Sequence, residues 1–310
     1  MKLKKFGSLL IIGIMLTSCE NSQTMDFSAS QSDDQEIALP DTGSSSEEDK
    51  EYWYHNAAEI TSYKLTQARY GELHEGTAVF VFVTEPFSTV NFTKADSQSS
   101  DNVSVLKLNQ TRKFTTGIYP YSMMTSSFFP FKEGNHSIKV SSSMQEWCGH
   151  VFMDLRTAKS GFNASVNSYF EGESYADKNI PKALLEDDVW SLLRLRTKLP
   201  IGKVKMYPSQ SYARLMHKEF KPYSCEIELL EGDNNNTYKL YYPALDRTLE
   251  INFEAGGTHK INGWSETYLS GFGNNQTKLT TTATRMKTIN SKYWSKNSIA
   301  DSTLRIELKL

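Results

Sequence analysis

The sequence predicts a mainly β fold: an antiparallel curved sheet, or a partly open β-barrel, with one or two inserted helices. Three observations favour this fold. From Tyr52 onward the chain is dense in tyrosine, phenylalanine, threonine and valine, which favour strands. Short runs of these residues alternate with glycine- and asparagine-containing turns. One stretch, after Pro181, has the spacing of a helix.

The strands are expected in a regular series. Residues 57–70 and 76–84 predict a long hairpin, with Gly71 and Gly76 bracketing its turn and Pro86 ending its second strand. Further strands are expected at 103–115, 123–129, 136–145, 150–156, 164–170, 203–206, 225–230, 238–242, 248–253, 259–268 and 279–286. Many short antiparallel strands of this kind favour a curved or partly closed sheet.

The main helix is expected to begin near Pro181, because proline suits the first helical turn. Leucine and tryptophan recur at close to helical spacing over 184–193. Acidic residues 186–188 come early and Arg194 comes late, as the helix macrodipole favours. Shorter helical segments are expected at 211–217 and 302–308.

Residues 1–18 have the features of a signal peptide. Lysines at positions 2, 4 and 5 precede an apolar run at 9–16 that is too short to span a bilayer. Leu16-Thr17-Ser18-Cys19 then matches a lipobox, in which small residues precede the cysteine that receives the lipid. We therefore expect cleavage before Cys19 and lipidation of Cys19 with diacylglycerol and palmitate-like acyl chains, which together anchor a protein stably.

Residues 19–50 are expected to form a flexible polar stalk, and residues 51–310 a single β-rich domain. The stalk is rich in serine and acidic residues, so it cannot bury enough apolar surface to offset its ordering entropy. Loss of residues 1–18 removes three lysines and no acid, and moves the formal net charge from −2 to −5. This charge argues against nucleic acid as a partner. We expect an exported protein, lipid-anchored to the cell envelope at the outer membrane.

Several blocks of the chain resemble a group of uncharacterised lipoproteins from the Bacteroidota, over most of the length after the stalk. These blocks are residues 52–54, 58–65, 67–73, 116–126, 145–150 and 168–173. Members of that group are often labelled "septum formation inhibitor Maf". Maf proteins are cytoplasmic nucleotide pyrophosphatases with a Ser-Pro-Arg-Arg stretch, which this chain lacks. The resemblance therefore implies location and architecture, and no activity.

One candidate site surrounds Cys148. On a regular strand Glu146, Cys148 and His150 share one face, where they could form a thiol nucleophile with its base, or two ligands of a metal. Gly149 indicates a bulge or turn instead, and no other motif completes a metal site. We therefore favour a buried Trp147 and a packed Cys148 beside a hydrogen-bonded His150, with no cofactor. With Cys19 lipidated, Cys148 and Cys225 form either one disulfide or, as we favour, two free thiols.

Two further groups of residues have alternative interpretations. Glu171 and Glu173 could act in acid–base chemistry, but a solvated turn is favoured. Aromatic and methionine residues at 119–124 and 128–131 could line an apolar cavity or pack in the core.

The chain has no phosphate-binding loop, nucleophile elbow, zinc-protease motif or EF-hand loop. The sequence therefore favours a non-enzymatic envelope lipoprotein that binds an apolar ligand or an envelope partner. One alternative is a hydrolase or thiol-dependent enzyme centred on Cys148 and His150. Another is a structural component of an outer-membrane assembly.

Overall fold

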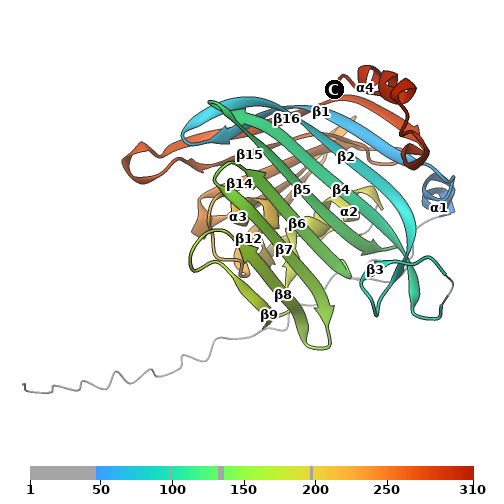
Figure 1. Ribbon diagram of the computed structural model, residues 1–310, viewed down its shortest axis with the longest axis horizontal. Coiled ribbons are helices and arrows are strands. Elements are labelled where there is room, and N and C mark those ends of the chain that lie inside the picture. The colour runs from blue at the N-terminus through green and yellow to red at the C-terminus, as the bar shows by residue number, and fades with distance from the viewer. Residues whose placement is uncertain (1–46, 98, 132–135, 196–197) are drawn as a thin grey trace, which may run out of the picture. The chain divides into compact units, whose positions relative to one another are not determined.

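Strands dominate the structure, and the expected antiparallel curved sheet is confirmed (Figure 1). The computed structural model describes residues 47–310, except 98, 132–135 and 196–197. The expected signal peptide 1–18, Cys19 and the stalk as far as residue 46 lie outside the described residues. Residues 47–50, expected as the end of the stalk, belong to helix α1.

All the strands expected from the sequence are present, with boundaries that differ by a few residues. The strands are β1 (Ala58–Arg69), β2 (Glu72–Ser88), β3 (Thr93–Lys94), β4 (Asn102–Thr116), β5 (Tyr119–Pro130), β6 (Lys139–Glu146), β7 (Gly149–Ala158), β8 (Gly161–Ser168), β9 (Tyr175–Ile180), β10 (Leu184–Leu185), β11 (Gly202–Tyr207), β12 (Tyr223–Leu230), β13 (Asn235–Tyr242), β14 (Arg247–Glu254), β15 (Ile261–Ser270) and β16 (Thr277–Ser291). The α-helices are α1 (Glu47–Trp53), α2 (Glu186–Arg194), α3 (Gln210–Leu215) and α4 (Thr303–Glu307), and short 3-10 turns are η1 (Pro243–Leu245), η2 (Gly273–Asn275), η3 (Tyr293–Ser295) and η4 (Ile299–Ser302).

The sheet is a meander in which most strands pair with their neighbours in the chain. Its order is β10-β11-β12-β13-β14-β15-β16-β1-β2-β4-β5-β6-β7-β8-β9, and β3 pairs with β2. Only β10 and β11 run parallel among the described pairs. The sheet is not closed, but its two edge strands, β9 and β10, are consecutive in the chain. The short link at residues 181–183 therefore carries the chain from one edge of the sheet to the other.

The first hairpin is present, but its turn and its end are not where the sequence predicted. The turn is at residues 70–71, and Gly76 lies inside β2, where a Cβ would come within 2.3 Å of the Lys113 carbonyl oxygen. Strand β2 also continues past Pro86. Proline has no backbone N–H to donate to a neighbouring strand. The pairing of β1 with β2 ends at Phe82, so no β1 carbonyl needs a hydrogen bond from position 86.

The main helix begins later than the sequence predicted. Leu184 and Leu185 form β10, which pairs in parallel with β11, and α2 starts at Glu186. The shorter helices expected at 211–217 and 302–308 are present as α3 and α4. Strand β9 was not predicted, because its side chains are mostly exposed at the sheet edge and lack an apolar pattern.

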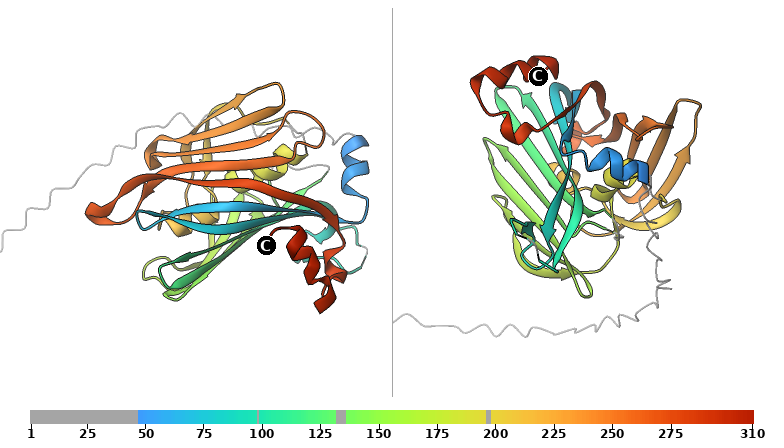
Figure 2. Two further views of the ribbon diagram at one scale, coloured as in Figure 1. Left: turned by 90° about the horizontal axis from the view of Figure 1, so that it is seen from above. Right: turned by 90° about the vertical axis from the view of Figure 1, so that its right-hand side faces the viewer.

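Helices α2 and α3 pack on the concave side of the sheet (Figures 1 and 2). The Trp190 ring of α2 contacts Phe80 of β2 and Trp264 of β15, with ring centroids 5.2 and 5.5 Å away. Burial of each such side chain stabilises the fold by roughly 2–3 kcal/mol. On the convex side α4 and the C-terminus cover β1 and β2, where Leu308 packs with Ile60 and Val83.

Candidate functional site

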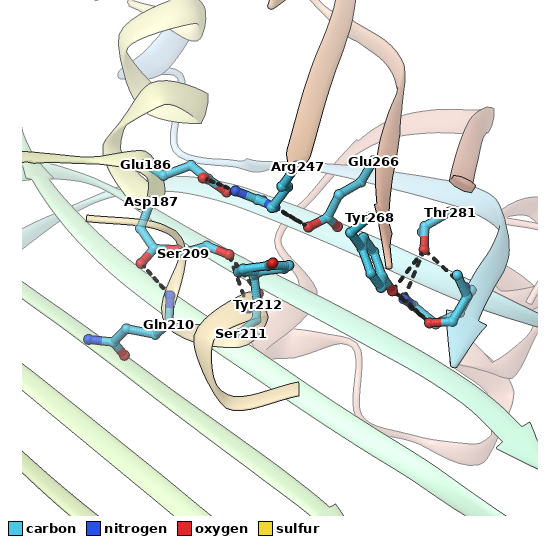
Figure 3. A network of polar contacts seen from close by, with 12 residues as sticks. Glu186, Asp187, Ser209, Gln210, Ser211, Tyr212, Arg247, Glu266, Tyr268 and Thr281 are labelled. Carbon is cyan, nitrogen blue, oxygen red and sulfur yellow. Dashed lines mark hydrogen bonds and ion pairs between the residues drawn. The ribbon is translucent and has the colours of Figure 1, made fainter. Parts of the chain in front are cut away.

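The polar side chains on the concave side form a connected network around the start of α2 (Figure 3). Glu186 makes a bidentate ion pair with Arg247, at 2.5 and 2.6 Å, and Arg247 also donates to Glu266 at 2.8 Å. Arg112 lies 3.5 Å from the other oxygen of Glu266. All four side chains are buried, and two cations match two carboxylates. This buried charge network therefore holds α2 on the sheet and serves the fold.

The next two acidic residues of α2 hold other segments in place. Asp187 accepts a hydrogen bond at 3.1 Å from the backbone N–H of Gln210 at the start of α3, which Figure 3 also shows. Asp188 accepts one at 3.1 Å from the backbone N–H of Ser137. Burial raises the pKa of Asp187 to about 8 and the pKa of Asp188 to about 7. The acidic run therefore fixes α3 and the segment before β6 at the centre of the fold.

At the end of β1, the Arg69 guanidinium is buried among aromatic rings. Its central carbon lies 4.2 Å from the ring centroid of Tyr70 and 5.5 Å from that of Phe272. It donates to the Leu215 carbonyl at 2.5 Å and to the Tyr121 hydroxyl at 3.4 Å. In the part of the chain that the structure describes, no ion pair joins Arg69 to a carboxylate. The rings and neutral oxygens replace that partner, and Arg69 ties β1 to the end of α3.

Three charged or titratable side chains, which we call the rim cluster, meet beside the end of α3: Glu173, Arg214 and His217. Glu173 lies 2.7 Å from Nδ1 of His217 and 3.1 Å from the Arg214 guanidinium. Burial disfavours the Glu173 carboxylate, but hydrogen bonds from Ser168 and His217 and the charge of Arg214 outweigh it and lower its pKa. Burial lowers the pKa of His217, which favours the neutral form of its imidazole.

The rim cluster borders a cavity of about 330 Å³ between α3 and strands β7, β8 and β9. Met153, Val166 and Tyr175 provide an apolar floor from the strands, and Phe220 adds to it from the segment after α3. Lys178 extends the charged rim. Small-molecule sites commonly enclose about 300–1,000 Å³, with an apolar lining and a few polar groups. We call this space the α3 cavity.

The structure separates the three residues of the candidate site that the sequence suggested. Cys148 lies in the turn between β6 and β7, where Glu146 pairs with Gly149 and Gln145 pairs with His150. Paired residues share a face and successive residues alternate, so Glu146 and His150 point to opposite faces. The arrangement on one strand face is therefore not formed, and the turn is at the position that Gly149 indicated. The favoured packing is also wrong, because Trp147, Cys148 and His150 are all exposed where the chain turns between β6 and β7.

Both remaining cysteines are free thiols in this structure, and no disulfide joins them. Cys148 is exposed, and a hydrogen bond and the negative charge of Glu146 raise the pKa of its thiol. A raised pKa leaves less thiolate at neutral pH, and the thiolate is the reactive form. Cys225 is buried in β12, and burial raises its pKa to about 12.

Part of the aromatic and methionine run of β5 belongs to the core, whereas Met124 is 39% exposed. Tyr121, Met123 and Phe129 pack in the main cluster with α2. Of the two glutamates considered from the sequence, Glu171 is exposed and Glu173 enters the rim cluster.

Sequence reasoning did not identify Arg214 and His217, two of the residues that line the α3 cavity. It also did not identify Arg69 at the end of β1. Arg214 lies in the last turn of α3, and His217 follows two residues after the helix ends. A basic residue in a last helical turn is a known signal, which could have placed Arg214 on the helix but not beside Glu173.

No group of three or more potential metal-ligating side chains occurs among residues 47–310, outside the short gaps in the described chain. Within the same residues, none of the helices has the length and apolar character needed to cross a membrane. Comparison of the chain with protein-family models, with curated proteins and with solved structures found no match. The function must therefore be argued from the sites themselves.

Proposed function

We propose that this chain is an exported envelope lipoprotein whose β-rich domain binds a small amphipathic ligand in the α3 cavity without catalysis. The signal-peptide pattern and the lipobox at Cys19 support the location and an anchor in the outer membrane. The observation that carries the ligand-binding activity is the α3 cavity, with its apolar floor and charged rim.

The chemistry of the cavity supports a ligand with an apolar body and a polar head. The floor offers Met153, Val166 and Phe220 for the apolar part. At the rim, Arg214 is 7% exposed, and its Nε atom has no hydrogen-bond partner within the described structure. A buried donor of this kind gains free energy when a ligand supplies an acceptor. A polar head beside Arg214 would supply one.

An enzyme centred on Cys148 and His150 has less support. The neighbouring Glu146 raises the pKa of the Cys148 thiol, which reduces its nucleophilic form. His150 lies on the opposite face from Glu146. A third role, as a structural component of an outer-membrane assembly, has no specific observation in its favour.

The binding proposal is tested with 8-anilinonaphthalene-1-sulfonate, a small amphipathic fluorophore, and with the chain from residue 20 onward, which carries no lipid. We expect the dye to bind with a rise in fluorescence. Val166→Phe places a larger side chain in the cavity and is expected to weaken binding at least tenfold. Mass spectrometry of organic extracts from the purified protein should also identify a bound amphipathic molecule that the variant lacks.

The matched control is Val90→Phe, the same change at a site 63% exposed in the loop between β2 and β3. It should bind the dye as the unmodified chain does. Equal dye binding by all three proteins would show that the α3 cavity is not the site, and would contradict the proposal.

A further inference from the structure

A second recess, separate from the α3 cavity, lies at the ends of β6, β7 and β8. It is an open groove of about 700 Å³. Its main side chains are Gln145, Trp147, His150, Phe152, Asn167 and Tyr169. Gln145 pairs with His150, and Phe152 pairs with Asn167, so these four share one face of the sheet. Met153 and Val166 of the α3 cavity are their sequence neighbours and point to the other face.

Three aromatic rings of the groove are unusually open to solvent. Trp147 is 68% exposed, Tyr169 is 72% exposed and Phe152 is 45% exposed. Single exposed apolar residues are common, but three around one recess mark a contact surface. Each ring would bury a large apolar area on binding a flat partner.

The two most exposed rings are held in place before any ligand arrives. Trp147 stacks on Tyr119, with centroids 6.1 Å apart and planes at 28°. The Tyr119 hydroxyl in turn donates to the Tyr70 hydroxyl at 3.1 Å. Tyr169 packs on Gly149, where a Cβ would come within 2.6 Å of the tyrosine ring. Rings fixed in this way lose little conformational entropy on binding.

The polar side chains of the groove are neutral hydrogen-bonding groups. Gln145 and Asn167 each provide an amide, and His150 provides an imidazole. Glu146 is the one carboxylate of the lining, and it already accepts a hydrogen bond from the backbone N–H of Cys148 at 2.6 Å. The described lining contains no lysine or arginine. Single-stranded nucleic acid and anionic ligands need such cations, so the groove does not fit them.

We infer that this groove binds an uncharged saccharide chain. The apolar C–H faces of sugar rings stack on Trp147 and Tyr169, and sugar hydroxyls pair with Gln145, His150 and Asn167. A lipid surface would cover these three polar side chains without partners, which costs free energy. A polyhydroxylated ligand supplies the partners and also matches an open groove rather than a closed cavity. The site does not depend on the ligand proposed for the α3 cavity.

The test uses the full chain, purified in a detergent without a sugar head group. Isothermal titration calorimetry measures binding of neutral hexasaccharides: maltohexaose, cellohexaose, mannohexaose and xylohexaose. We expect at least one to bind and to quench tryptophan fluorescence. Trp147→Ala and Tyr169→Ala should each weaken that binding at least tenfold. Trp294→Ala, the same loss at a tryptophan 48% exposed outside the groove, should leave it unchanged.

Because both groove residues are exposed, the variants should keep the thermal transition of the unmodified chain, which circular dichroism checks. Absence of binding by all four neutral sugars would overturn the inference. So would sugar binding that Trp147→Ala and Tyr169→Ala leave intact. Binding to vesicles of phosphatidylethanolamine and phosphatidylglycerol that requires Trp147, with no sugar bound, would assign the groove to a membrane surface and also overturn it.

Discussion

Arg247 is a buried cation whose charge is matched by carboxylates of the protein itself. Its side chain is 1% exposed and lies between Glu186 and Glu266. Burial by itself lowers the pKa of a guanidinium, but the two carboxylates outweigh that effect and raise the pKa of Arg247 well above its ordinary value. Buried ion pairs offset their desolvation cost only when the pairing is complete. The bidentate contact with Glu186 meets that condition.

We predict that Arg247→Met lowers the free energy of unfolding by about 3–5 kcal/mol, because it leaves Glu186 buried without a cation and leaves Glu266 with Arg112 alone. Urea unfolding measures the loss. The matched control is Arg285→Met, which breaks a 2.7 Å pair with Glu254 in which both side chains are partly exposed. Arg285→Met should lower the free energy of unfolding by less than about 1 kcal/mol. Similar losses in both variants would show that the buried charge network does not stabilise α2.

At the scale of elements, the strands could be predicted because their β-favouring residues and turns are local signals. The start of α2 could not. Leu184 and Leu185 fit the helical spacing, and only their parallel pairing with β11, about twenty residues later in the chain, makes them a strand. The rim cluster also depends on long-range contact, since Glu173 and His217 are 44 residues apart. The break at Gly149 was foreseen because glycine is itself a local signal.

The acidic run of α2 should make stability depend on pH. Asp187 and Asp188 have folded pKa values of about 8 and about 7, above their unfolded value of 3.8. The folded chain therefore holds more protons than the unfolded chain between pH 4 and pH 7–8. Stability from these groups is fully present below pH 4 and is lost as pH rises through this window.

We predict that Asp188→Asn removes part of the stability loss that accompanies rising pH. Between pH 5 and pH 7 its unfolding free energy should fall less steeply than that of the unmodified chain, by up to about 1.4 kcal/mol per pH unit for one proton. Urea unfolding at pH 5, 6 and 7 measures the two slopes. His136 and His217 have lowered pKa values and act in the opposite direction, so the difference between the two proteins is the quantity to compare.

The control for this prediction is Asp301→Asn at the exposed end of the chain. The pKa of Asp301 is lowered by hydrogen bonds from Ser298, so it does not titrate in this window. The unfolding free energy of Asp301→Asn should change with pH as steeply as that of the unmodified chain. If Asp188→Asn also gave an unchanged slope, Asp188 would be ionised throughout, and the account of its burial would be wrong.

At the scale of the whole molecule, the two faces of one sheet present different surfaces. Side chains alternate along each strand, so Met153 faces the α3 cavity while Phe152 faces the groove. The concave face is covered by α2 and α3, whereas part of the convex face is covered by the C-terminal segment. Leu308 seals that part, and Ser62 donates a hydrogen bond to its carbonyl at 2.5 Å. An open sheet needs such covers because an exposed apolar face promotes association.

We predict that Leu308→Ala lowers the free energy of unfolding by about 2 kcal/mol, because the leucine is 7% exposed and leaves a cavity over Ile60 and Val83. Urea unfolding measures the change. Ile306→Ala removes a side chain 78% exposed in α4, two residues before Leu308, and should alter stability by less than about 0.5 kcal/mol. Truncation after residue 298 should go further and produce dimers or larger species in light scattering. A truncated chain that stays monomeric with unchanged stability would show that the C-terminal segment is not a cover for the sheet.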